Sequence, residues 1–127
     1  MLPELTTVLI KEGHTFPRQV RLLNSQDFEA VFRNNTSRLS DQSWTLLALK
    51  NKFDYARLGM AISKRVLKSA VDRNRIKRIV RENFRHHQID ICGFDVIIMC
   101  KKNVTEMDNM KLSDSLNGLW MQVKNSG

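Results

Sequence analysis

The sequence has little cysteine, little proline and no long apolar run. Its 127 residues include two cysteines, Cys92 and Cys100, which stand eight positions apart with no CxxC pair, so neither a disulfide framework nor a zinc site is predicted. The two prolines lie near the start, and there is no internal repeat. No segment approaches the length needed to cross a bilayer, and residues 1–10 lack a basic leader. We therefore expect a soluble, cytoplasmic protein with reduced thiols.

The sequence also lacks a set of residues that would suit a protein-only hydrolase. Such an enzyme needs clustered carboxylates for metal ions or a nucleophile beside a base. His86 and His87 are adjacent on an expected helix and so diverge, and a lone carboxylate at a strand start, such as Asp95, is more typical of a cap or turn. The other acids are scattered without a DxD or HxD pair: Asp41, Asp54 and Asp90. We predict no catalytic residue and no protein-held metal site.

Acidic residues are few, and the basic excess is focused in one segment. There are 21 Lys and Arg residues against 13 Asp and Glu, for a formal net charge of +8 and a pI near 9.9. This charge favours a polyanionic partner, with nucleic acid ahead of an acidic membrane surface. Residues 64–85 carry nearly the whole excess, because only Asp72 and Glu82 oppose nine basic residues there: Lys64, Arg65, Lys68, Arg73, Arg75, Lys77, Arg78, Arg81 and Arg85.

The first half of the chain is predicted to form a helix followed by strands. The length suits one domain, which we place at residues 16–127, after a flexible N-terminal arm over residues 1–15. Ser25 can cap a helix over about residues 26–34, in which Phe28 and Phe32 lie on one face. Strand-favouring stretches then alternate with polar breaks, and they predict an antiparallel meander of three strands at residues 37–40, 44–49 and 57–63. In the last strand, one face carries only small residues: Gly59, Ala61 and Ser63.

The second half is predicted to form two helices around a buried strand. Ser69 and Asp72 indicate a helix start, and the helix extends to about His87 with its apolar face at Ile76, Ile79, Val80 and Phe84. Residues 95–100 are apolar on both faces, as in a strand within a sheet. A last helix, opening at Thr105 or Asp108, has its apolar stripe at Leu112, Leu116, Leu119, Trp120 and Val123. The predicted fold is α+β, a single-domain α/β sandwich in the order α-β-β-β-α-β-α, whose mixed four-stranded sheet contains a β-α-β crossover.

The basic helix admits two interpretations. A generic charge run is usually a solvated helix face. Here, however, Arg73, Lys77 and Arg81 form a like-charged ladder at i, i+4 spacing, which costs helix stability. An anionic partner would remove that cost, and guanidinium groups bind phosphate oxygens in a bidentate manner. We therefore favour nucleic-acid binding.

The same stretch carries a specific resemblance. Ser63-Lys64-Arg65, Lys68, Ala70, Arg73-Asn74-Arg75, Lys77-Arg78 and Arg81-Glu82 resemble the signature of the bacterial ribonuclease P protein family. The likeness extends over roughly residues 16–122 and includes Phe16-Pro17-Arg18, Arg21-Leu22, Phe28, Phe32, Arg57-Leu58-Gly59, and Asp95 with the strand that ends in Lys101-Lys102. One departure from the family pattern is the Lys64-Arg65 pair, where family members often have two lysines. Arginine and lysine carry the same charge, so the charge of the pair is unchanged.

The resemblance implies a subunit of the ribonucleoprotein that removes the 5′ leader from precursor tRNA, with catalysis and most of the Mg²⁺ in the RNA. The leader would lie in a groove between helix and sheet, at Phe28, Phe32, Ala61 and Ser63. The resemblance also implies a left-handed β-α-β crossover. The residues that would dock on the catalytic RNA are Lys64, Arg65, Lys68, Arg73, Asn74, Arg75, Lys77, Arg78 and Arg81.

Several alternatives stay open from the residues alone. Phe28 and Phe32 suit plain core packing as well as base stacking, whereas Trp44 and Trp120 are expected in the core. A ribosomal-type structural RNA-binding protein would show a similar basic face. A helix-turn-helix DNA reader is a weaker option, because no partner helix closely precedes the basic helix. We expect RNA partners, no DNA and no membrane.

Overall fold

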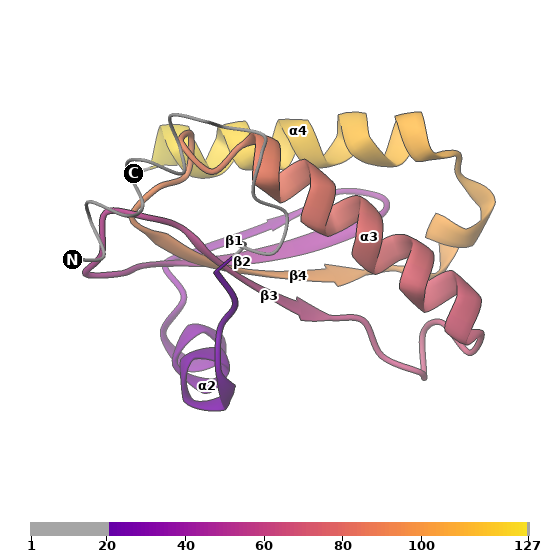
Figure 1. Ribbon diagram of the computed structural model, residues 1–127, viewed down its shortest axis with the longest axis horizontal. Coiled ribbons are helices and arrows are strands. Elements are labelled where there is room, and N and C mark those ends of the chain that lie inside the picture. The colour runs from indigo at the N-terminus through magenta and orange to yellow at the C-terminus, as the bar shows by residue number, and fades with distance from the viewer. Residues whose placement is uncertain (1–20, 127) are drawn as a thin grey trace.

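A computed structural model describes residues 21–126 as a four-stranded sheet with helices on both faces (Figure 1). The arm predicted over residues 1–15 lies outside the described residues. The elements, in chain order, are α2 (Ser25–Asn34), β1 (Ser37–Ser40), β2 (Trp44–Lys50), β3 (Arg57–Ala61), α3 (Ala70–His86), β4 (Phe94–Cys100), the 3-10 helix η2 (Lys102–Glu106) and α4 (Asn109–Ser126). The predicted element order and the α+β class are therefore confirmed. No helix within this part of the chain is both long and apolar enough to span a membrane.

The sheet is mixed, and its strand order is β1-β2-β4-β3. β2 pairs antiparallel with β1 and with β4, whereas β3 pairs in parallel with β4. The predicted meander is therefore wrong for its third strand, because β4 lies between β2 and β3. The physical reason is that β4 is buried along nearly its whole length, and a strand that is apolar on both faces belongs at the centre of a sheet.

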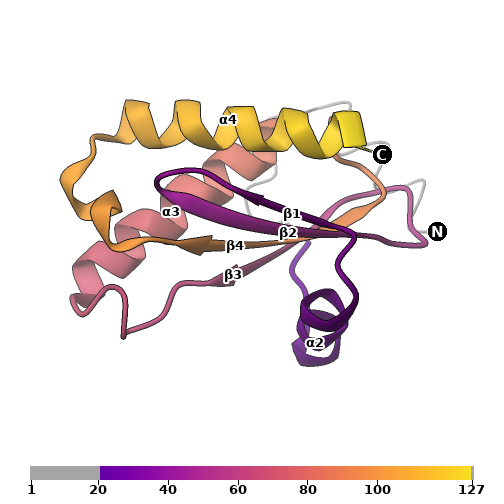
Figure 2. The same cartoon turned by 180° about the vertical axis from the view of Figure 1, so that it is seen from behind.

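The connection from β3 through α3 to β4 is left-handed. In Figure 1, α3 lies above the sheet, β3 is the strand nearest the viewer and β4 lies behind it; Figure 2 shows the reverse depth order. Both strands run in the same direction, so the chain moves to the left when seen from the helix side with the strands pointing up. Such connections are right-handed in about 98% of cases. The handedness that the resemblance implied is therefore present.

The face of the sheet that carries α3 and α4 contains the main hydrophobic core. Phe84 of α3 and Trp120 of α4 are fully buried and meet edge to face, with ring centroids 6.0 Å apart. Trp44 of β2 is also fully buried, and its indole nitrogen donates to the Leu112 carbonyl at 3.3 Å. The apolar stripes predicted for both helices are buried in this core.

The opposite face of the sheet is covered in part by α2, which lies below it in Figure 1. A smaller apolar cluster forms there from Leu23, Val31, Leu47 and Ile97, with Phe28 packed against it. The helix begins one residue earlier than predicted, because Asn24 is its N-cap. Its side chain accepts from the Asp27 amide at 2.9 Å, and Asp27 accepts in return from the Asn24 amide at 3.4 Å, which forms a capping box.

Candidate nucleic-acid interface

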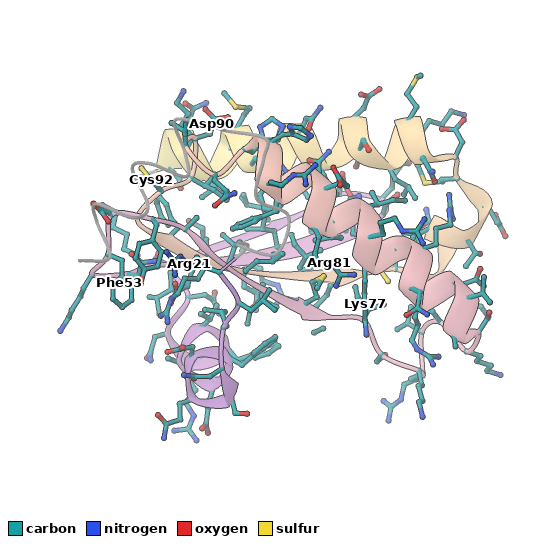
Figure 3. The ribbon with its side chains drawn as sticks, viewed as in Figure 1. Arg21, Phe53, Lys77, Arg81, Asp90 and Cys92 are labelled. Atoms are coloured by element: carbon teal, nitrogen blue, oxygen red, sulfur yellow. The ribbon has the colours of Figure 1, made fainter. Side chains whose placement is uncertain are left out.

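Helix α3 holds most of the predicted RNA-docking residues on its outer side. Its N-cap is Ser69, whose hydroxyl accepts from the Asp72 amide at 3.3 Å. The four apolar residues predicted to face the core are its buried residues, so the basic side chains must lie along the rest of the helix. Figure 3 shows Lys77 and Arg81 on the same side of α3. Of the nine predicted RNA-docking residues, the exposed ones are Lys64, Arg65, Lys68, Asn74, Arg78 and Arg81, and the half-buried ones are Arg73, Arg75 and Lys77.

The cations of the i, i+4 ladder have no acidic partner within residues 21–126. Glu82, the second acid of the helix, accepts from Arg85 at 2.6 Å and lies 3.7 Å from His86. Asp72 lies in the first turn, where a carboxylate stabilises the helix dipole. Arg73, Lys77 and Arg81 therefore keep their mutual repulsion in the free protein, as the sequence predicted.

A cavity of about 310 Å³ lies at the start of α3. It is bounded by the loop before the helix and by η2, so it joins two segments that are distant in the chain. Its cationic side chains are Arg65, Lys68 and Lys102, against a single acid, Asp72. We call it the basic cavity; its other lining residues are Val66, Leu67, Ser69 and Thr105.

The two arginines of the Arg-Asn-Arg element are hydrogen-bonded to the chain itself. Arg73 donates through Nη1 to the carbonyls of Leu67 and Lys68, at 2.8 and 2.9 Å. Arg75 donates through Nε, Nη1 and Nη2 to groups at the η2–α4 junction. Sequence reasoning treated these arginines like the other cations, because the residue type does not reveal which donors the fold occupies.

The predicted leader-binding aromatics lie on α2, and they differ in burial. Phe28 is half-buried against the smaller apolar cluster, whereas Phe32 is 46% exposed. Their rings stack with centroids 6.3 Å apart and planes at 24°. Phe28 also lies directly over β3, since a Cβ added to Gly59 would come within 2.7 Å of its Cζ. Phe28 therefore has a packing role, and Phe32 presents an aromatic surface to solvent.

The small-residue face of β3 is shorter than predicted. The strand ends at Ala61, which is half-buried and packs beside the smaller apolar cluster. Ser63 is not part of the strand. It lies in the turn before α3, where its hydroxyl accepts from the Val66 amide at 3.3 Å and its carbonyl accepts from the Leu67 amide at 3.0 Å. The turn begins early because the chain must leave the sheet to enter α3.

An ion-pair network that the sequence analysis missed joins α2 to the sheet. Arg57 donates to both oxygens of Asp95, at 2.9 and 2.7 Å, and to Asp27 of α2 at 2.9 Å. Asp95 is 5% exposed and accepts a further bond from Asn51 at 2.8 Å. These partners, Asp95 first, raise the pKa of Arg57 above its usual value. Asp95 is thus neither a cap nor a turn residue; the direct pairing of Arg57 with Asp95 in the sheet register explains the contact.

The described residues contain no group of three His, Cys, Asp or Glu side chains that could hold a metal ion. The basic surface and the half-covered aromatic surface are instead features of nucleic-acid binding.

Comparisons with known proteins give the family. The Ribonuclease P family model matches residues 16–124. The ribonuclease P protein component of Marinomonas sp. (strain MWYL1) is 42% identical over 110 residues, which cover 87% of this chain and 83% of that protein. The corresponding protein of Thioalkalivibrio sulfidiphilus is 45% identical over 108 residues, covering 85% and 89%.

Solved structures agree. The chain is similar to the RNase P protein of Thermotoga maritima, with a TM-score of 0.72 at 29% identity over 82% of this chain and 97% of that one. It is also similar to the Staphylococcus aureus RNase P protein, with a TM-score of 0.70 at 29% identity over 77% and 89%. This chain belongs to the bacterial ribonuclease P protein family.

Proposed function

We propose that this chain is the protein subunit of a ribonuclease P that removes the 5′ leader of precursor tRNA, with hydrolysis carried out by the RNA subunit. The observation that supports this most strongly is the Arg73, Lys77 and Arg81 ladder, whose cations have no acidic partner in the described part of the chain. Phosphates of a bound RNA would relieve that repulsion and release counterions. The complex would act in the cytoplasm.

The protein is proposed to bind two RNAs through different surfaces. The catalytic RNA docks on the RNA-docking surface, which is Lys64, Arg65, Lys68, Arg73, Asn74, Arg75, Lys77, Arg78 and Arg81. The single-stranded leader binds the leader surface, which is Phe28, Phe32, Ala61 and Ser63. Bases stack on exposed aromatic rings without regard to sequence, and the exposure of Phe32 supports this assignment.

Magnesium is proposed to be held mainly by the RNA. Mg²⁺ usually takes one or two carboxylates together with phosphate oxygens and water. In the protein, Asp95 and Asp27 form ion pairs with Arg57, so these carboxylates suit a structural role better than the binding of a metal ion. The protein contributes by neutralising the repulsion between two polyanions, and this lowers the magnesium that their association needs.

Reconstitution tests the proposal. The purified chain is mixed with a bacterial ribonuclease P RNA at low magnesium, and removal of the leader from a precursor tRNA is measured. We expect the chain to stimulate cleavage, and duplex DNA to compete poorly. Absence of stimulation would contradict the proposal and favour a ribosomal-type RNA-binding role. Cleavage by the protein alone, after exhaustive removal of RNA, would instead indicate a protein-only nuclease.

The salt dependence of RNA binding tests the docking surface. Replacing Lys77 with Gln should weaken binding and reduce the slope of log K against log salt by about one unit, because one phosphate contact is lost. A matched control is Lys124→Gln on α4, whose side chain lies 3.6 Å from Asp90 and outside the proposed surface. We expect Lys124→Gln to leave the slope unchanged. If Lys77→Gln also leaves the slope unchanged, Lys77 makes no phosphate contact and its side chain faces solvent in the complex.

A further inference from the structure

Within residues 21–126, Arg75 donates more side-chain hydrogen bonds to its own chain than any other predicted RNA-docking residue. Its guanidinium donates to Asn109 Oδ1 at 3.0 Å, to the Val104 carbonyl at 3.4 Å and to the Met107 carbonyl at 2.6 Å. Three of its five N–H groups are therefore directed at protein acceptors. The three acceptors lie in the middle of η2, at its C-cap Met107 and at the first residue of α4, so the guanidinium bridges α3 to the junction between η2 and α4.

The other docking residues differ in this respect. Within residues 21–126, no hydrogen bond or ion pair is made by the side chains of the remaining docking residues apart from Arg73: Lys64, Arg65, Lys68, Asn74, Lys77, Arg78 and Arg81. Their polar ends are available for a ligand. Arg75 is also half-buried, whereas Arg78, one turn further along α3, is exposed.

The contacts of Arg75 fix one boundary of the basic cavity. Lys102 and Thr105 of η2 line that cavity, and Arg75 donates to the carbonyl of Val104 in the same short helix and to that of Met107, its C-cap. Arg73 makes the matching contact on the other boundary, through the carbonyls of Leu67 and Lys68. The spacing between Lys102 and the cations of the preceding loop thus depends on both arginines.

We propose that Arg75 is a positioning residue, which holds η2 against α3 so that the cations of the basic cavity meet RNA phosphates at a fixed spacing. This inference rests on the proposed function, because it concerns the same RNA-docking surface. Its guanidinium acts through Val104, Met107 and Asn109 rather than through a phosphate. A lysine at this position would keep the charge, but it could not direct three planar donors at these acceptors.

The test compares conservative substitutions at two positions of the same helix. Affinity for a bacterial ribonuclease P RNA is measured for Arg75→Lys and for the control Arg85→Lys, well below the melting temperature of each variant. We expect Arg75→Lys to bind about tenfold more weakly, because several hydrogen bonds to a charged group are lost. Arg85→Lys should stay within about twofold of the original chain, because Arg85 lies outside the RNA-docking surface and pairs with Glu82 of its own helix.

Asn109 supplies a second, uncharged variant. Asn109→Ala should weaken RNA binding about threefold, through loss of one hydrogen bond to Arg75. The double variant Arg75→Lys, Asn109→Ala should bind no more weakly than Arg75→Lys alone, since the effects of two substitutions that remove the same contact do not add. A direct phosphate contact by Arg75 predicts instead that Asn109→Ala has no effect.

The outcomes separate this inference from the proposed function. Failure of the original chain to bind RNA or to stimulate cleavage contradicts the proposed function itself. If the original chain is active but Arg75→Lys binds the RNA within twofold of the original affinity, the positioning role is overturned. A lower melting temperature for Arg75→Lys with unchanged RNA affinity also overturns it, because that result reports a contribution to stability alone.

Discussion

The two faces of the sheet use similar apolar side chains for different purposes. On the face under α3 and α4, both tryptophans and Phe84 are fully buried. On the face under α2, Phe28 is half-buried and Phe32 is 46% exposed. An aromatic ring that is enclosed contributes mainly to stability, whereas one that keeps solvent contact remains available to a ligand. The first face therefore specifies the fold, and the second keeps an aromatic surface in contact with solvent, where we propose that substrate binds.

The largest effect should come from the enclosed face. Phe84→Ala removes a ring that packs edge to face on Trp120, and we expect it to lower the free energy of unfolding by about 3 to 5 kcal/mol. The matched substitution on the other face, Phe32→Ala, should cost no more than about 0.5 kcal/mol, because the side chain is largely exposed. Urea unfolding followed by circular dichroism gives both values. Equal losses of unfolding free energy for the two variants would contradict the different roles assigned to the two faces.

A smaller effect is expected where the two layers approach most closely. Gly59→Ala would place a Cβ within 2.7 Å of the Phe28 ring, so the ring must shift, at a cost of about 1 to 3 kcal/mol. Gly118→Ala on α4 is the control, because its added Cβ would meet nothing within 4 Å beyond its chain neighbours and the backbone of its own helix. That change should stabilise the protein by about 0.5 to 1 kcal/mol through helix propensity. Thermal melts would show shifts of opposite sign.

The substrate role proposed for the face under α2 gives a more selective prediction. Phe32→Ala should weaken binding of precursor tRNA to the reconstituted enzyme by about 1 kcal/mol, the low end for base–aromatic stacking. Binding of mature tRNA should not change, because it has no leader. Phe28→Ala should weaken precursor binding and also lower the melting temperature. If the two variants weaken binding of precursor and mature tRNA equally, both rings serve only to pack the protein.

The two thiols provide the mildest test. Cys100 lies on the enclosed face, and burial raises its pKa to about 11, whereas Cys92 is exposed beyond the end of α3 (Figure 3). A thiol-specific reagent at pH 8 should therefore modify Cys92 in the folded protein and both residues in urea, because the thiolate is the reactive form. Rapid modification of Cys100 without denaturant would contradict the burial of β4.

Local patterns in the sequence predicted the helices well. The Ser69 cap and the 3.6-residue periodicity gave α3 to within one residue at each end, and the stripe of α4 is buried as expected. The start of α2 was placed one residue late, because Asn24 and Ser25 are both good caps and the reciprocal bond of Asp27 decides between them. Capping depends on neighbouring residues, so short sequence windows contain most of this information.

Long-range contacts were predicted less well. The position of β4 between β2 and β3 does not follow from the order of elements, and neither does the Arg57–Asp95 pair, whose members are 38 residues apart. The handedness of the crossover was available only from the family resemblance, because the general rule predicts the opposite hand. At the site, residue types identified the basic surface, but they could not distinguish Arg75, whose donors are occupied, from Arg78.

The central position of β4 also determines when the sheet can be completed during synthesis. β2 ends at Lys50 and β3 at Ala61, yet the strand that joins them spans Phe94–Cys100. Until that segment leaves the ribosome, Leu47 and Leu58 lack the neighbour beside which they are buried, and non-local pairing of this kind is slow and exposes apolar surface to aggregation. The nascent chain should therefore gain most of its protease resistance in one late step, after the ribosome has translated well beyond Cys100.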